Sequence, residues 1–229
     1  MYKNDLFYSS FYIINTQMEH NNDISGVNNI IELYENSLWR NWITLIPMSK
    51  TFPFEDYNRK NHFIHVANIL LDDEVYKNGK NKGNKKRKTL IKFNPIIQSK
   101  EFNKKNEWIY LFVINNRIVK IGGTRMGLRN RAVSYLCGHH IKERKKSGKC
   151  SITNAIIYNT FLFYLSNGCS IKMYGYELPV IETTVEIFDK KVKLYPQTYH
   201  AYESIFLSDY KKIHNTYPIL NVKCDPDYV

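Results

Sequence analysis

Two short apolar runs on either side of an Asn-Asn pair constrain this fold more than any other feature of the chain. Residues 107–124 read EWIYLFVINNRIVKIGGT, with Asn115-Asn116 between the runs. Asparagine tolerates the left-handed backbone conformations that a tight hairpin turn requires. The stretch therefore predicts a β-hairpin in which Tyr110 and Lys120 are direct or diagonal neighbours across the two strands.

Lys120 is an unusual residue for the second strand, which is otherwise apolar from Ile118 up to Gly122-Gly123. A lysine beside a tyrosine hydroxyl favours the phenolate, so we expect Lys120 to lower the pKa of Tyr110. Such a phenol accepts a proton from water more readily at neutral pH. Taken singly, Tyr110 is also an ordinary strand aromatic and Lys120 a charged residue that snorkels at a strand end.

Two expected helices carry further polar candidates. Residues 127–136 predict a helix that places Arg131 and Tyr135 on one face, four residues apart. The planar guanidinium of an arginine can hold a phosphate. A later helix is expected over residues 198–215, with Glu203 inside it. One carboxylate suffices for a magnesium ion that keeps several waters and takes its other ligands from substrate phosphate.

Alternating polar and apolar residues predict the remaining elements of the second half of the chain. Strands are expected in CSIKMYGYEL, IETTVEIF and KVKLYP, with a hairpin turn at Asp189-Lys190 between the last two. A helix is expected to open at Ser151 and to stop at Gly168. No internal repeat is present.

The net charge indicates a polyanionic partner. Lys and Arg outnumber Asp and Glu by 33 to 21 in 229 residues, a net charge of +12. This charge favours nucleic acid or an anionic membrane surface, although a lysine-rich proteome gives a similar excess. The longest strongly apolar run, IYLFVI, is far shorter than the roughly 20 residues of a membrane-spanning helix. We therefore expect no membrane partner.

The N-terminus and the cysteines favour a cytoplasmic location. The first residues, MYKNDLFYSSFYIIN, lack the basic start and unbroken apolar stretch of a signal peptide. The four cysteines show no CxxC spacing and are expected to be reduced thiols.

A basic stretch divides the chain. Residues 77–88, KNGKNKGNKKRK, hold seven Lys or Arg, two Gly and no acid, so a loop or linker is expected at 77–89. It is either a solvated spacer or an arm that lies along phosphates. Before it, residues 1–76 are expected to be mostly helical, with helices at 25–42 and 61–73.

The order of the polar candidates resembles the GIY-YIG nuclease family. Trp108-Ile109-Tyr110 stands for its first motif and Lys120-Ile121-Gly122 for its second. Arg131 follows at the place of the family's essential arginine. Glu203 matches its metal-binding glutamate, and Asn221 in PILN matches a terminal asparagine that often supports the site.

The resemblance, which covers about residues 107–221, is strongest to one subgroup. Lysine in place of the second motif's tyrosine resembles a set of GIY-YIG type II restriction endonucleases. Tyr135 stands where many members have histidine, one helical turn after the arginine. The resemblance implies an α+β fold in which residues 90–229 form a catalytic domain with a small antiparallel sheet flanked by helices. Residues 1–76 and the insertions would then serve DNA recognition or dimer formation.

The activity that the resemblance implies is hydrolysis of phosphodiesters in duplex DNA without a covalent intermediate. Tyr110 would be the general base and Lys120 would keep it poised. Arg131 would neutralise the nonbridging oxygens. Glu203 would bind Mg²⁺, or Mn²⁺ in its place, while Asn221 and Tyr135 would hold the site together.

Basic residues are the expected contacts to DNA phosphates. The candidates are Lys85, Lys86, Arg87, Lys88, Arg125, Arg129, Arg144, Lys145 and Lys146. A homodimer is expected, because enzymes that cut palindromes usually pair two sites by two-fold symmetry. A DNA methyltransferase would belong to the same system without direct contact. Two alternatives stay open: a homing or phage nuclease, and a DNA-binding protein that does not cleave.

Overall fold

The structure, a computed structural model, describes residues 43, 44, 46, 51–75, 77–84, 87–139 and 150–224. At its centre is a six-stranded antiparallel sheet with the strand order β1-β5-β4-β6-β2-β3. The strands are β1 Phe52–Pro53, β2 Ile64–Leu71, β3 Ile91–Pro95, β4 Trp108–Ile114, β5 Arg117–Thr124 and β6 Ile171–Glu177.

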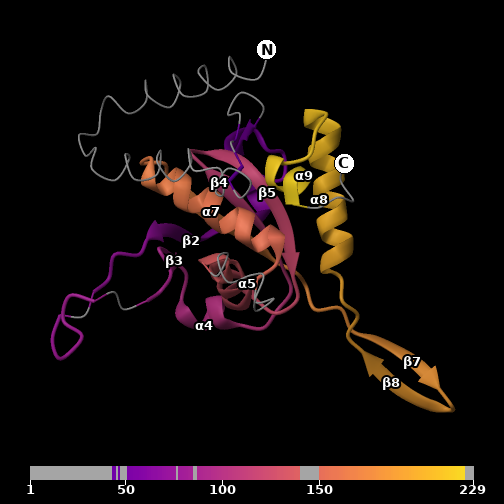
Figure 1. Cartoon of the computed structure of the whole chain (residues 1–229). Helices are drawn as coiled ribbons and strands as arrows, with labels where there is room; N and C mark the ends of the chain where they lie inside the picture. The colour runs from indigo at the N-terminus through magenta and orange to yellow at the C-terminus, as the bar shows by residue number, and fades with distance from the viewer. Residues whose placement is uncertain are drawn as a thin grey trace.

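Helices cover both faces of this sheet, which confirms the α+β fold class (Figure 1). One face carries α4 Ser99–Asn103, α5 Leu128–Leu136, α7 Ile152–Ser166 and α9 Ile219–Cys224. The other carries α8 Tyr199–His214 and two short 3-10 helices, η2 Phe54–Asp56 and η3 Lys60–His62. None of the described helices is long and apolar enough to cross a membrane.

Strand β4 is buried along its whole length and contributes side chains to both hydrophobic cores. Tyr110 and Phe112 pack into the core beneath α5 and α7, whereas Ile109 and Leu111 pack into the core beneath α8. This division follows from the strand geometry, because successive side chains point to opposite faces.

The hairpin expected from Asn115-Asn116 is confirmed. Both asparagines have positive φ, 44° and 63°. The register shifts by one residue after Phe112, so Tyr110 lies opposite Gly122 and Lys120 lies opposite Phe112. Tyr110 and Lys120 are therefore diagonal neighbours on the same face of the sheet.

The elements expected in the second half are also confirmed. Ser151 caps α7, its hydroxyl accepting a hydrogen bond from the Asn154 backbone N–H at 3.1 Å. Strands β7 Thr183–Ile187 and β8 Lys190–Leu194 form a separate two-stranded sheet. Their turn is centred on Phe188-Asp189, one residue earlier than expected.

The helix expected over residues 61–73 is wrong, because this segment forms β2. β2 pairs with β3 and β6 and buries Val66 and Ile69. Pairing on both sides stabilises a segment rich in β-branched residues as a strand, overriding any local helical preference. The basic stretch at 77–89 therefore lies between β2 and β3 of one sheet. The helix expected at 25–42 lies outside the described residues.

Candidate active site

The candidate site lies at the outer edge of β5. Strand β1 pairs with β5 only at Arg117 and Ile118, so in the described part of the chain the rest of this edge has no strand partner. Gly122 lets the Tyr110 ring lie against this edge, because a Cβ atom at Gly122 would overlap the Tyr110 hydroxyl. A glycine is therefore required there for the observed position of the phenol.

Two phenols and one guanidinium form the centre of the site. The hydroxyl oxygens of Tyr110 and Tyr135 are 2.6 Å apart. Arg131 donates from Nε to the Tyr110 oxygen at 2.8 Å and from Nη2 to the Tyr135 oxygen at 2.9 Å. Arg131 and Tyr135 come from successive turns of α5, as their four-residue spacing predicts. These bonds use two of the five N–H donors of an arginine and leave three for another group.

The electrostatics of Tyr110 differ from the sequence-based expectation. Burial raises the pKa of Tyr110, and the Arg131 charge and the Tyr135 hydrogen bond only partly offset this effect. The expectation of a lowered Tyr110 pKa is therefore wrong, because desolvation of a fully buried phenol dominates. For Arg131, burial acts to lower the pKa, but the two phenols outweigh it and raise the pKa, so the guanidinium stays charged.

The positive charge of Lys120 affects the pKa of Glu203. Lys120 is only 6% exposed. Burial raises the pKa of Glu203, while the charges of Lys120 and Arg131 and a hydrogen bond from the Gly123 backbone work to lower it. A Cβ atom at Gly123 would come within 2.8 Å of the Glu203 carboxylate, so this second glycine admits Glu203 to the strand edge. The Gly-Gly step thus accommodates Tyr110 and Glu203 in turn.

Asn221 takes the place of a missing strand partner beside β5. Its side-chain oxygen accepts from the Ile121 N–H at 3.0 Å, and its amide nitrogen donates to the Ile121 carbonyl at 2.8 Å. Asn221 is 2% exposed, and it belongs to α9. One side chain therefore holds both backbone groups of the residue between Lys120 and Gly122.

The donor set suits one type of cation. In the part of the chain that the structure describes, no cluster of three or more His, Cys, Asp or Glu could hold a metal ion. Glu203 is the carboxylate beside the phenols, and its burial, which raises its pKa, makes a nearby cation favourable. A single hard oxygen ligand fits a Mg²⁺ ion that keeps most of its waters, and does not fit a zinc ion with four protein ligands.

The basic candidates for DNA contacts are spread over the molecule. Arg125 is exposed just before α5, Arg129 is exposed in its first turn, and Lys88 is exposed before β3. Arg87 donates to the buried Asp72 at 3.0 Å and lies 3.7 Å from Glu74, a structural contact that its place in a basic run did not suggest. The remaining candidates, Lys85, Lys86, Arg144, Lys145 and Lys146, lie outside the described residues.

Glu107 is a residue of the site region that the sequence did not reveal. Its Oε2 accepts hydrogen bonds from the Thr198 backbone N–H at 2.8 Å and from the Thr198 hydroxyl at 2.9 Å. These two hydrogen bonds hold the start of α8, the helix that carries Glu203, against the start of β4. The two partners are 91 residues apart, so no local pattern connects them.

Comparisons with known proteins find likeness in structure alone. No protein-family model matches the chain, and no curated protein matches it in sequence. It is similar to the structure of restriction endonuclease HPY188I in complex with product DNA, with 23% identity, 75% of this chain and 87% of that chain covered, and a TM-score of 0.47. It is also similar to a mutant of bacteriophage T4 EndoII, with 19% identity, coverage of 69% and 94%, and a TM-score of 0.43.

Proposed function

We propose that this chain is a metal-dependent DNA endonuclease of the GIY-YIG type that acts as a type II restriction enzyme on a short sequence in duplex DNA. One observation carries the proposal: Arg131 joins two buried phenols at the outer edge of β5, with Glu203 and Lys120 beside them. The residues at positions 110, 120, 131 and 203, which follow one another in the motif order, lie on four different elements: β4, β5, α5 and α8.

Tyr110 is the proposed general base, which takes the proton of the attacking water. Its raised pKa means that only a small fraction is ionised at neutral pH, and this fraction is a strong base. Arg131 Nε and the Tyr135 hydroxyl both reach the Tyr110 oxygen, so each can donate to a phenolate there. Arg131 retains three N–H donors, which would bind the nonbridging oxygens of the scissile phosphate.

Glu203 would hold the Mg²⁺ ion, or Mn²⁺ in its place, and this cation would supply Lewis-acid stabilisation of the leaving 3′-oxygen. Lys120 would keep Glu203 ionised, since its charge lowers the pKa of that carboxyl against the effect of burial. Asn221 would keep Ile121, and with it the Lys120 and Gly122 positions, in place.

The proposed partners follow from this activity. Duplex DNA is the substrate, and Arg125, Arg129 and Lys88 would contact its phosphates. A homodimer would cut both strands of a palindrome. A methyltransferase of the same system would protect host DNA without touching this chain.

Cleavage of supercoiled plasmid tests the function. We expect discrete fragments with Mg²⁺ and none with EDTA. Tyr110→Phe removes the base and should lower the cleavage rate by about 10²–10⁴-fold while DNA binding is kept. Tyr176→Phe is the matched control, because Tyr176 packs against Phe206 and Tyr202 in the other core. This variant should cleave plasmid at the wild-type rate.

Other results would change the assignment. Full activity of Tyr110→Phe would remove Tyr110 from the mechanism. A smear of products would indicate a nonspecific nuclease, and retarded but uncut plasmid would indicate a DNA-binding protein without cleavage.

A further inference from the structure

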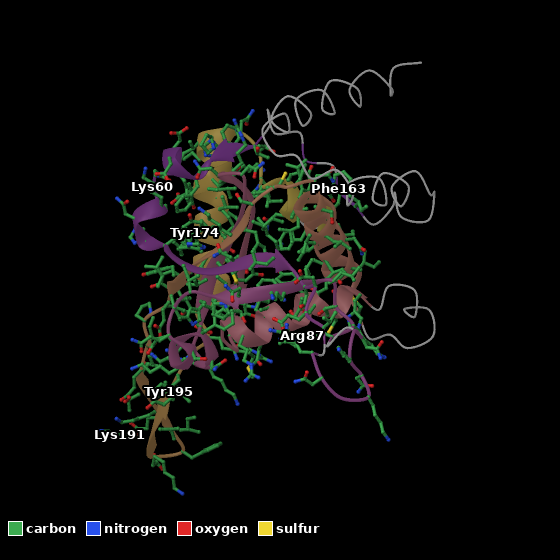
Figure 2. All side chains as sticks on the ribbon, turned by 90° about the vertical axis from the view of Figure 1, so that its left-hand side faces the viewer. Lys60, Arg87, Phe163, Tyr174, Lys191 and Tyr195 are labelled. Atoms are coloured by element: carbon green, nitrogen blue, oxygen red, sulfur yellow. The ribbon has the colours of Figure 1, made fainter. Side chains whose placement is uncertain are left out.

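Strands β7 and β8 form an arm, residues 182–195, that projects away from the sheet and helices (Figure 1). Figure 2 shows Lys191 far out on the arm and Tyr195 closer to the body. One face of the arm exposes Ile187, Val192 and Leu194 beside the half-buried Val185, with Lys190 at its outer end, and the tip residue Phe188 is 94% exposed. An isolated two-stranded hairpin is at best marginally stable in water, so this arm needs a partner.

The charges on the arm favour a protein partner over DNA. Its other face pairs its own charges: Glu182 lies 2.7 Å from Lys193 and accepts from the Tyr195 hydroxyl at 3.0 Å. Residues 182–195 contain three acids (Glu182, Glu186, Asp189) and three lysines (Lys190, Lys191, Lys193), a net charge of zero in a chain of +12. Binding to phosphates requires a positive excess, and the arm lacks one.

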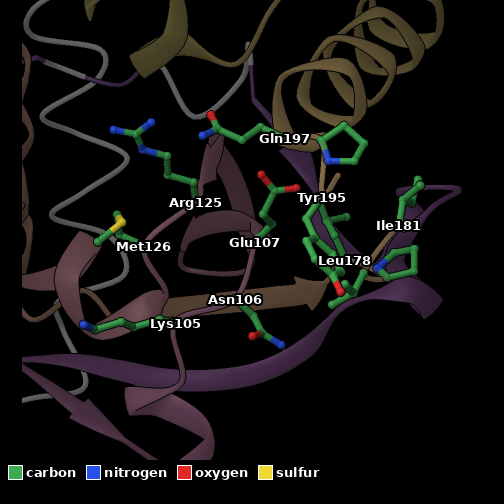
Figure 3. Close-up of a pocket in the computed structure, with 12 residues that line it drawn as sticks. Lys105, Asn106, Glu107, Arg125, Met126, Leu178, Ile181, Tyr195 and Gln197 are labelled. Atoms are coloured by element: carbon green, nitrogen blue, oxygen red, sulfur yellow. The ribbon is translucent and has the colours of Figure 1, made fainter. Parts of the chain in front are cut away.

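A pocket of about 420 Å³ opens at the root of the same arm (Figure 3). Figure 3 shows Leu178, Ile181 and Tyr195 on one side of this root pocket, with Lys105 and Arg125 on the other. The root pocket thus has an apolar side and a side with Lys105 and Arg125, with the Glu107 carboxylate between them, so an aromatic ring suits the apolar side and a carboxylate suits the rim at Lys105.

The arm tip carries that pair of groups. Phe188 and Asp189 are adjacent in the turn, both with positive φ, 48° and 63°. We propose that two copies of this chain exchange arms, so that Phe188 of each copy fills the root pocket of the other. Asp189 then lies against Lys105.

An exchange of arms between two copies gives a closed dimer. Each strand of the arm spans about 17 Å, so two arms packed antiparallel by their apolar faces bring each tip to the other root. The contact is isologous, because the tip meets the root pocket twice about one two-fold axis, and assembly stops at a dimer.

This inference rests on the proposed homodimer and deepens it by naming the contact. Glu107 and Gln197 also line the root pocket, and Glu107 holds Thr198 at the start of α8. The tip of one copy therefore sits next to the helix that carries Glu203 in the other copy.

Sedimentation velocity of the full chain without DNA tests the exchange. We expect wild-type protein to be a dimer and Phe188→Ser to be a monomer with an unchanged unfolding temperature, since the side chain is solvent-exposed within one chain. Ile152→Ser is the matched control: Ile152 is 53% exposed on α7, far from the arm in sequence, and should leave the dimer intact.

A charge exchange locates the contact between copies. Asp189→Lys and Lys105→Asp should each weaken the dimer, because both of its tip contacts become repulsive. An equal mixture of the two variants should recover it, since the lysine at position 189 of one copy then meets the aspartate at position 105 of the other.

A wild-type monomer at all concentrations would overturn the exchange, as would a Phe188→Ser dimer as tight as wild type. Weaker DNA binding by Phe188→Ser with an unchanged dimer would assign the arm to DNA instead. Plasmid cleavage is read separately: monomeric Phe188→Ser that nicks single strands would support both proposals. Loss of cleavage in a wild-type dimer would affect the proposed function alone.

Discussion

At the scale of single residues, the contacts of Arg131 decide what the candidate site can do. Its two bonds to phenol oxygens that lie only 2.6 Å apart allow one phenolate, since two negative oxygens at that distance would repel. Burial raises the pKa of both Tyr110 and Tyr135. The site is thus held protonated at rest and should gain activity as pH rises.

The Tyr135→Phe variant tests this coupling. The hydrogen bond from Tyr135 lowers the pKa of Tyr110, so removing it should raise that pKa further. A base acts only when deprotonated, so single-turnover cleavage below the Tyr110 pKa should slow about tenfold for each unit of increase. The plot of log rate against pH should move to higher pH. An unmoved pH profile would show that Tyr135 only fills space.

At the scale of elements, the short helix α9 completes the edge of β5. A buried strand edge with unpaired N–H and C=O groups is costly, and Asn221 satisfies both groups of Ile121. The same contact fixes the backbone between Lys120 and Gly122. Stability and the alignment of the site are therefore linked through one side chain.

Asn221→Ala should destabilise the fold by about 2–4 kcal/mol, because two buried backbone groups lose their partners. Urea unfolding measures the change. Asn130→Ala is the control: its side chain donates to the Met126 carbonyl on the exposed surface of α5, and its loss should cost no more than about 0.5 kcal/mol. Equal losses for the two variants would contradict the edge role.

At the scale of the whole molecule, the body and the arm differ in charge and in exposed apolar surface. The chain carries +12 overall, whereas the arm of residues 182–195 is neutral and presents an apolar face. The body would therefore bind DNA phosphates, and the arm would bind a second copy.

The salt dependence of DNA affinity distinguishes these two surfaces. Arg129→Ala should reduce the slope of log affinity against log salt concentration by about one, the loss of one phosphate contact. Lys191→Ala, on the polar face of the arm opposite Glu186, should leave the slope unchanged. A reduced slope for Lys191→Ala would place the arm on DNA.

Local signals in the sequence were sufficient for several elements. The Asn115-Asn116 turn, the Ser151 cap and the spacing of Arg131 and Tyr135 each act within a few residues, and all three are confirmed. The prediction of a helix at the β2 segment failed because this segment forms a strand only by pairing with β3 and β6, which are distant in sequence. The resemblance implied that the motif residues form one site, and the fold brings their elements together because α5 follows β5 directly and α8 packs on β5.

The sequence by itself determined the hairpin and the helix that follows it, because short-range backbone preferences and spacing specify these. The polar residues of the cluster were singled out by the resemblance of the motif order to a known family. Only the tertiary structure decided their electrostatics. Burial raises the pKa of Tyr110 where the sequence predicted a lowering, and Lys120 acts on Glu203 instead. Desolvation depends on every element packed around a group, and the root pocket likewise forms only where distant segments meet.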